Sequence, residues 1–148
     1  MKTINYIDLF AGAGGLSEGF IASGFHPIAH VEMNKEACYS LKTRACYYYL
    51  MNAGKMSIYK NYLKGNITRE TLYSMVPQSI LNSIINQTMT KDSMPVLFKQ
   101  IDSLLVEQKI DAVDLLVGGP PCQAYSLVGR ARKSDGMVND PRNHLYKL

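Results

Sequence analysis

Cys122 is the residue of this 148-residue chain whose setting most favours covalent chemistry. It follows Pro120 and Pro121, which come directly after an apolar run that ends in glycine. Because proline restricts the backbone and has no amide hydrogen, these residues would hold the thiol rigidly at the end of a strand. A cysteine near positive charge ionises easily and acts as a nucleophile, although an inert buried thiol is the commoner case for an isolated cysteine. We expect Cys38 and Cys46, on or near a predicted helix, to be inert thiols of this kind.

A glycine-rich turn follows the apolar run 4–10 and indicates a ligand site of a different kind. Its spacing does not fit a dinucleotide-binding turn, because the third glycine of that pattern would fall at Ser17. The carboxylate of Asp8, just before the turn, would repel a pyrophosphate but attract the amino and sulfonium groups of S-adenosylmethionine. Glu32, about 20 residues after Gly12, is placed to accept hydrogen bonds from two ribose hydroxyls.

The elements that must position these residues alternate between strands and helices. Apolar runs over 4–10 and 26–33 predict strands. Helical spacing follows the glycine turn and returns over 34–44, where Asn34 is a plausible N-cap. An almost uninterrupted apolar run over 111–119 predicts a strand that is buried on both faces. This order of strands and helices predicts an α/β fold with a parallel sheet.

The middle of the chain gives a weaker pattern. Residues 46–63 are rich in tyrosine and show no clear periodicity, so no element is assigned to them. The pattern becomes helical from Thr68, which is a capping candidate, and a second amphipathic stretch runs over 95–109. We therefore expect a helical insertion over about 68–109.

Composition excludes several classes of protein. Hydrophobic residues make up 47% of the chain and charged residues 19%, which is typical of a folded globular protein. No run approaches the roughly 20 apolar residues of a membrane span, and we expect a cytoplasmic protein. The three cysteines lack the spacing of a zinc site, so we expect no metal. The net charge is +4, and the basic residues after Gln123 suit a polyanionic partner, although charge alone is better explained by a solvated surface with no partner.

Four motifs, taken together and in this order, carry a family resemblance. They are YIDLFAGAGGLSEGF over 6–20, VEMNKEA over 31–37, DLLVGGPPCQAYS over 114–126 and DPRNHLY over 140–146. On these motifs the chain resembles the cytosine-5 DNA methyltransferases. The resemblance implies a Rossmann-like, S-adenosylmethionine-dependent methyltransferase fold with a mostly parallel sheet and flanking helices, truncated after the strand that precedes the cysteine loop. It implies that residues 1–148 are the N-terminal portion of the catalytic domain and lack the target recognition domain.

The resemblance also implies which residues contact S-adenosylmethionine. Glu32 would bind the ribose, and Met33 would lie against the adenine ring. The segment GNIT over 65–68 is similar to one that usually reads Gly-Asp-Ile in the family, so Asn66 would accept a hydrogen bond from the adenine amino group. The other residues implied in the pocket are Phe10, Gly12, Gly14, Leu16, Ile67 and Leu145.

The implied activity is that of a DNA (cytosine-5-)-methyltransferase, the modification part of a bacterial restriction-modification system acting on double-stranded DNA. The Cys122 thiolate would add to C6 of a flipped-out cytosine and make C5 nucleophilic. The residues implied to contact the DNA or the target base are Pro121, Gln123, Ser126, Arg130 and Arg132.

In the family, a glutamate in a downstream Glu-Asn-Val motif assists the reaction, and these 148 residues do not contain that motif. We therefore expect the chain to be inactive alone, to need the C-terminal part of the enzyme and to self-associate. Two alternatives remain open at this point. One is methylation of cytosine in transfer RNA, since a branch of the family acts there, and the other is a catalytically dead cofactor-binding or DNA-binding module. The presence of both Cys122 and Glu32 argues against the second alternative.

Overall fold

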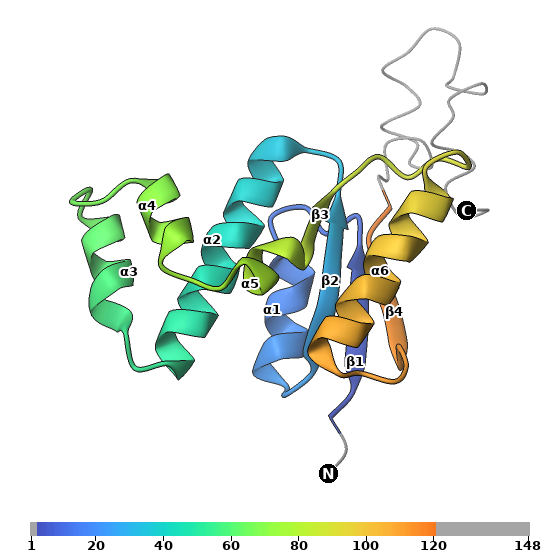
Figure 1. Cartoon of the computed structure of the whole chain (residues 1–148), viewed down its shortest axis with the longest axis horizontal. Coiled ribbons are helices and arrows are strands. Elements are labelled where there is room, and N and C mark those ends of the chain that lie inside the picture. The colour runs from blue at the N-terminus through green and yellow to red at the C-terminus, as the bar shows by residue number, and fades with distance from the viewer. Residues whose placement is uncertain (1–2, 121–148) are drawn as a thin grey trace, which may run out of the picture.

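Four parallel strands form a single sheet in the order β3-β2-β1-β4 (Figure 1). The computed structural model describes residues 3–120, and residues 1–2 and 121–148 lie outside the described part. The strands are β1 (Asn5–Leu9), β2 (His26–Glu32), β3 (Ile84–Asn86) and β4 (Leu115–Gly118). The helices are α1 (Gly15–Ala22), α2 (Lys35–Asn52), α3 (Met56–Leu63), α4 (Arg69–Ser74), α5 (Gln78–Asn82) and α6 (Met94–Gln108).

The direction in which strands are added to the sheet reverses at β1. The chain moves from β1 to β2 and β3 on one side, and then crosses back to place β4 on the other side of β1. Because crossovers between parallel strands are right-handed, α1 and α2 lie on one face of the sheet and α6 lies on the other (Figure 1). Open α/β sheets bind ligands at the carboxyl ends of the strands beside such a reversal. The carboxyl ends of β1 and β4 are therefore the expected place for a ligand.

The main core lies between the sheet and α6. Ile7 of β1 and Ile28 of β2 are almost fully buried, and Leu97 and Leu104 of α6 pack in the same cluster. The two leucines are about two helical turns apart and so share one face of the helix. Burial of a side chain of this size contributes about 1.5–3 kcal/mol, so this cluster fixes the sheet on which the ligand edge is built.

A second, smaller core lies between α2 and the short helices that follow it. Cys46 and Leu50 of α2 are fully buried against Leu72 of α4 and Leu81 of α5. These helices extend away from the sheet on the side of β3 (Figure 1). The chain therefore has one apolar cluster under the sheet and another that holds the helices beyond α2 together.

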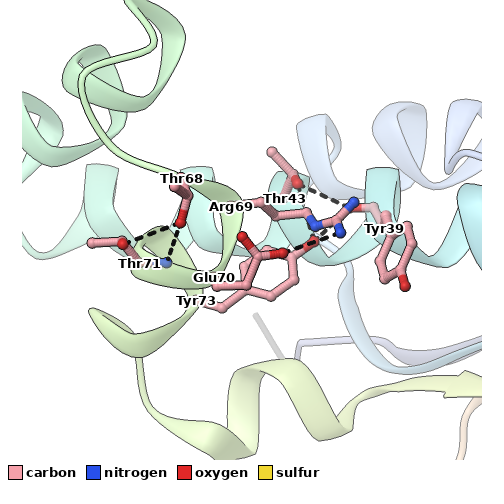
Figure 2. Close-up of polar contacts among 7 residues, drawn as sticks. All are labelled: Tyr39, Thr43, Thr68, Arg69, Glu70, Thr71 and Tyr73. Carbon is pink, nitrogen blue, oxygen red and sulfur yellow. Dashed lines mark hydrogen bonds and ion pairs between the residues drawn. The ribbon is translucent and has the colours of Figure 1, made fainter.

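The predicted α/β fold is confirmed, and so are most of its predicted elements. Strands β1, β2 and β4 lie within the predicted runs 4–10, 26–33 and 111–119. Asn34 caps α2, since its Oδ1 accepts a hydrogen bond from the Ala37 N–H at 2.8 Å. Thr68 caps α4 in the same way, and its Oγ1 accepts from the Thr71 N–H at 3.2 Å (Figure 2).

The segment over about 68–109, where a helical insertion is expected, contains three helices and also one strand. Between α5 and α6 the chain forms β3, three residues long, which pairs with β2. Ile84 and Ile85 are buried in this strand, so packing and pairing stabilise it although it is short. Residues 46–63, unassigned from sequence, complete α2 and form α3. No helix among the described residues combines the length and the apolar character that a membrane span requires.

Candidate functional site

The glycine turn after β1 has a backbone conformation that few residues adopt. Phe10, Gly12 and Gly14 all have positive φ values, of 56°, 55° and 88°. The Gly14 N–H closes the turn by donating to the Ala11 carbonyl at 2.9 Å. A Cβ at Gly14 would lie 2.9 Å from Leu41 Cδ2, so both the backbone conformation and the space require glycine there. The turn thus brings bare backbone to the carboxyl end of β1.

Glu32, at the end of β2, binds this turn directly. Its Oε2 accepts a hydrogen bond from the Gly12 N–H at 2.8 Å, and its Oε1 accepts from the Asn34 N–H at 2.7 Å. Bonds from an amide to an ionised carboxylate are stronger than those between neutral groups. Each carboxylate oxygen can accept more than one hydrogen bond, so Glu32 can still receive donors from a ligand. The carboxylate is therefore held in a fixed orientation at the ligand edge.

Asn86, at the end of β3, is a member of this edge that the sequence analysis missed. Its Nδ2 donates to the carbonyl oxygens of Glu32 and Met33, both at 3.0 Å. These bonds fix the connection from β2 to α2 and leave the Asn86 side-chain oxygen as an acceptor. The signal that could have found it is the apolar pair Ile84–Ile85 followed by a polar residue, which is a short strand with a polar end.

Two of the expected pocket residues have exposed apolar side chains, and each lies near the glycine turn or Glu32 in the sequence. Leu16, at the start of α1, is 49% exposed, and Met33, directly after Glu32, is 65% exposed. Phe10 is half-buried and packs against the main core cluster. Exposed apolar side chains beside fixed polar groups are typical of ligand-binding sites. The structure therefore brings Phe10, Gly12, Leu16, Glu32 and Met33 to the carboxyl ends of β1 and β2.

Asn66 and Ile67 are not brought to this edge. They lie in the connection between α3 and α4, which is remote from the carboxyl ends of the strands in Figure 1. The Asn66 Nδ2 donates to Asn61 Oδ1 at 3.4 Å, and Ile67 packs against the second core. The physical reason is that two helices and a connection separate this segment from β3, the strand that does reach the edge.

The end of β4 leads the chain past the glycine turn. Gly118 pairs with Leu9, and a Cβ at Gly118 would collide with the Leu9 carbonyl, so glycine is required where the two strands approach. The described part of the chain ends at Pro120, shortly after this pair. The expected site residues that lie outside the described residues are Pro121, Cys122, Gln123, Ser126, Arg130, Arg132 and Leu145.

A buried polar cluster lies at the start of α1. Ser17, which is fully buried, donates from its Oγ to Asp8 Oδ2 at 2.9 Å, and its Oγ lies 2.8 Å from His30 Nε2 and 2.8 Å from the Tyr6 hydroxyl. These bonds tie α1 to β1 and β2. The expectation that Asp8 faces a cationic ligand is wrong, since Asp8 is only 1% exposed and its carboxylate binds Ser17.

Burial shifts the pKa values within this cluster in opposite directions. Removal from water lowers the pKa of His30 to about 4, and the positive charge of Arg44 adds to the effect. Burial raises the pKa of Asp8, and the charge of Glu32 acts in the same direction, against the hydrogen bond from Ser17. Both shifts favour the uncharged form. The cluster is therefore a set of buried hydrogen-bonding groups under the glycine turn.

The described cysteines have the properties of inert thiols. Cys38 and Cys46 are both buried and unpaired. Burial raises the pKa of Cys46 to about 11, and burial together with the charge of Glu32 raises the pKa of Cys38. Within residues 3–120, no three His, Cys, Asp or Glu side chains are grouped so that they could hold a metal ion.

An all-parallel sheet with a glycine turn and a strand-end carboxylate beside its reversal point defines a Rossmann-like α/β protein. The chain belongs to the family of C-5 cytosine-specific DNA methylases, which matches residues 4–69 and 84–147. The match leaves out 70–83, which contains most of α4 and all of α5.

Curated relatives agree with this family. The type II methyltransferase M.Bpa9945I of Bacillus paralicheniformis is 37% identical over 95% of this chain and 36% of its own length. The type II methyltransferase M1.HphI of Haemophilus parahaemolyticus is 27% identical over 98% of this chain and 27% of its own length. M.AquIA of Picosynechococcus, also a type II methyltransferase, is 27% identical over 94% of this chain and 39% of its own length. The chain thus spans less than half of each relative, and no solved structure matches it.

We predict that His30 makes the fold less stable in acid. Its pKa is lowered from an ordinary 6.5 to about 4, so the unfolded chain binds the proton more tightly. The free energy of unfolding should therefore fall as pH decreases from 6.5 towards 4, by about 3 kcal/mol from this group. Urea denaturation across this range should show a shallower pH dependence in His30→Gln than in the wild type.

The exposed His26 provides a control for this measurement. His26→Gln leaves the buried His30 in place and should therefore keep the part of the pH dependence that is due to His30. Parallel curves for the wild type and His30→Gln would show that His30 is not the group responsible.

Proposed function

We propose that this chain supplies the cofactor-binding edge and the nucleophile of an enzyme that methylates C5 of cytosine in DNA, as part of a restriction-modification system. Family membership and relatives that are type II methyltransferases support the class of reaction. The observation that carries the proposal is the Glu32 carboxylate bound to the Gly12 amide at the reversal point of the sheet. This arrangement offers a fixed anionic acceptor beside bare backbone.

S-adenosylmethionine is the methyl donor that fits these residues. Glu32 would accept hydrogen bonds from the ribose hydroxyls, and the exposed side chains of Leu16 and Met33 would cover the apolar surface of the cofactor. The turn at Gly12 and Gly14 would let the cofactor approach the backbone closely. When bound, the cofactor would supply a methyl group activated by a positively charged sulfur.

Asn86 is better placed than Asn66 to accept from the adenine amino group. Both residues offer an amide oxygen, but Asn86 follows the strand next to β2 and bonds to the carbonyls of Glu32 and Met33. Asn66 lies in the α3–α4 connection. We therefore propose that Asn86, at the end of β3, makes the adenine contact that the sequence analysis expected of Asn66 and Ile67.

Cys122 would act as the nucleophile. The chain leaves β4 beside the glycine turn, two residues before Pro120, so the cysteine follows the strand that borders the cofactor edge. Its sulfur would bond to C6 of cytosine, and the electron pair of the C5–C6 double bond would move to C5, which takes the methyl group. Loss of the C5 proton to a base then expels the thiolate and restores the ring. Gln123, Ser126, Arg130 and Arg132 would contact the DNA and the flipped base.

The exposed side of β4 is suited to pack against the remaining part of the enzyme. Among the described residues β4 pairs with β1 alone, and Leu116 in it is 62% exposed. Apolar residues on an unpaired strand promote association. The C-terminal part, on the same chain or on another, would cover this strand, and without it the protein would self-associate there.

The first prediction concerns the cofactor. S-adenosylhomocysteine should bind the chain measurably, and Glu32→Gln should weaken binding by about 1–3 kcal/mol because charge-assisted hydrogen bonds are lost. Glu107→Gln, on the exposed surface of α6, is the matched control and should bind as the wild type does. Calorimetric titration measures both, and tighter binding of NAD than of S-adenosylhomocysteine would contradict the assignment.

The second prediction concerns the nucleophile. With the C-terminal part supplied, DNA that carries 5-fluorocytosine should form a covalent adduct with Cys122, because fluorine at C5 cannot leave as a proton does. Mass spectrometry of the digested adduct locates the bond. Cys122→Ser should abolish the adduct, while Cys46→Ala should not. An adduct at Cys38 or Cys46 would show that the nucleophile is misassigned.

The third prediction is that the 148-residue chain alone does not methylate DNA. It contains no Glu-Asn-Val motif, and general acid–base assistance of this kind is commonly worth about 10² to 10⁴ in rate. Incubation with DNA and a tritiated methyl donor should transfer label only after the downstream part is added in trans. Efficient transfer by the chain alone would refute the proposed division of the site.

A further inference from the structure

A groove lined by tyrosines runs along the side of α2 that faces α1, α3 and α4. Its volume is about 710 Å³, and it lies apart from the edge that holds Glu32 and Gly12. Five tyrosines line it, all of them only partly buried: Tyr39, Tyr47, Tyr48, Tyr59 and Tyr62. None of these residues has a role in the proposed methyl transfer.

The tyrosine rings in the groove form a continuous aromatic surface. The Tyr47 ring lies 5.2 Å from both the Tyr48 and the Tyr59 rings, and the Tyr59 ring lies 6.0 Å from the Tyr62 ring, measured between centroids. Because the rings come from both α2 and α3, the second core holds the two halves of the surface together. A preformed aromatic surface of this kind can stack planar ligands.

Two arginines stand within this aromatic surface. The Arg69 guanidinium lies over the Tyr39 ring at 3.7 Å from its centroid, as Figure 2 shows. Arg44 pairs with Glu18, which also accepts a hydrogen bond from the Tyr48 hydroxyl at 2.7 Å. Arg44 is thus neutralised at the floor of the groove. Within residues 3–120, Arg69 pairs with the highly exposed Glu70 alone, and solvent weakens this attraction.

The segment from which most of the groove is built is basic, although the lining itself holds Glu18 and Glu36 beside its two arginines. Residues 35–75 contain seven lysines and arginines and two glutamates, a net charge of +5, whereas the whole chain has +4. The same segment holds seven of the ten tyrosines. Aromatic rings that stack on bases, set among cations that pair with phosphates, are the features by which proteins bind single-stranded nucleic acid.

We propose that the tyrosine groove is a second nucleic-acid site, which stacks unpaired bases on its rings and binds the backbone phosphates through Arg69 and neighbouring lysines. Duplex DNA fits this surface less well, because its bases are already stacked and only its phosphates are accessible. The site uses no residue of the cofactor edge. Binding there is therefore independent of whether the chain binds S-adenosylmethionine or transfers a methyl group.

Fluorescence anisotropy with a labelled oligothymidylate of about 12 nucleotides tests this site on the whole chain. Tyr47→Leu should weaken binding about ten-fold, because the central ring of the aromatic surface is removed without removing charge. Arg69→Gln should lower the slope of log K against log salt by about 0.7, since one phosphate contact is lost. Circular dichroism shows whether each variant keeps its helices.

Matched controls lie on α6, on the other face of the sheet. Phe98→Leu removes an exposed aromatic ring, and Lys99→Gln removes an exposed positive charge. Both should bind the oligonucleotide as the wild type does. Equal losses in the controls and in the groove variants would overturn the proposal, because they would show that binding depends only on overall charge.

Two further ligands test whether the groove prefers single-stranded DNA to a duplex and to a single nucleotide. A duplex of the same length and the free nucleotide dTMP should both bind at least about ten-fold more weakly than the single strand. Tighter binding of the duplex, or equal binding of the mononucleotide, would overturn the proposal.

Photocrosslinking of the wild-type chain tests the same site without any variant. An oligonucleotide that carries 5-iodouracil should crosslink to Tyr39, Tyr47, Tyr59 or Tyr62, and mass spectrometry identifies the tyrosine. Crosslinks confined to Tyr6, Tyr125 or Tyr146 would place the strand elsewhere and overturn the proposal.

Discussion

The Glu32 carboxylate is the interaction on which the ligand edge depends. It joins three elements, because one oxygen binds the turn after β1, the other binds the first turn of α2, and its own backbone belongs to β2. Asn86 secures the same residue from β3 by donating to its carbonyl. These hydrogen bonds therefore hold the glycine turn in its shape. A ligand that donates to Glu32 meets a group whose orientation is already fixed by the fold, which lowers the cost of binding.

A buried polar cluster lies under the turn that this carboxylate binds. Ser17 replaces the glycine that a dinucleotide-binding turn would have, and its hydroxyl bonds to Asp8, His30 and Tyr6. The sequence shows that Asp8 precedes the turn. The direction of the Asp8 side chain depends on its hydrogen bond with Ser17 in α1, which the sequence does not reveal. Pairing within the cluster keeps Asp8 away from the ligand, which leaves Glu32 as the carboxylate available to it. Two acids close in the fold thus have opposite environments, one buried and favoured neutral, the other partly exposed and bonded to amides.

Most of the sheet could be predicted from sequence because β1, β2 and β4 are apolar runs with polar or glycine ends, and these patterns depend on local residues. The strand β3 could not, since its three residues have no length or periodicity of their own and become a strand only by pairing with β2. That omission also bears on the adenine-side residue. With no third strand predicted, the segment 65–68 was the candidate, whereas the structure places Asn66 in the α3–α4 connection and Asn86 at the end of β3, beside Met33. Gly12, Glu32 and Met33 were predictable because each directly follows or ends a strand that was recognised.

The segment 70–83, which the family match leaves out, supports the tyrosine groove without lining it. Leu72 and Leu81, which lie in that segment, fill the second core against Cys46 and Leu50 of α2. This packing anchors α4, and through it Arg69, against the side of α2 that carries the tyrosines. The residues that line the groove all lie within the matched segment 4–69, so the unmatched helices hold this aromatic surface in place but do not form it. Because this surface and the ligand edge rest on separate apolar clusters, a change in one core is expected to leave the geometry of the other surface intact.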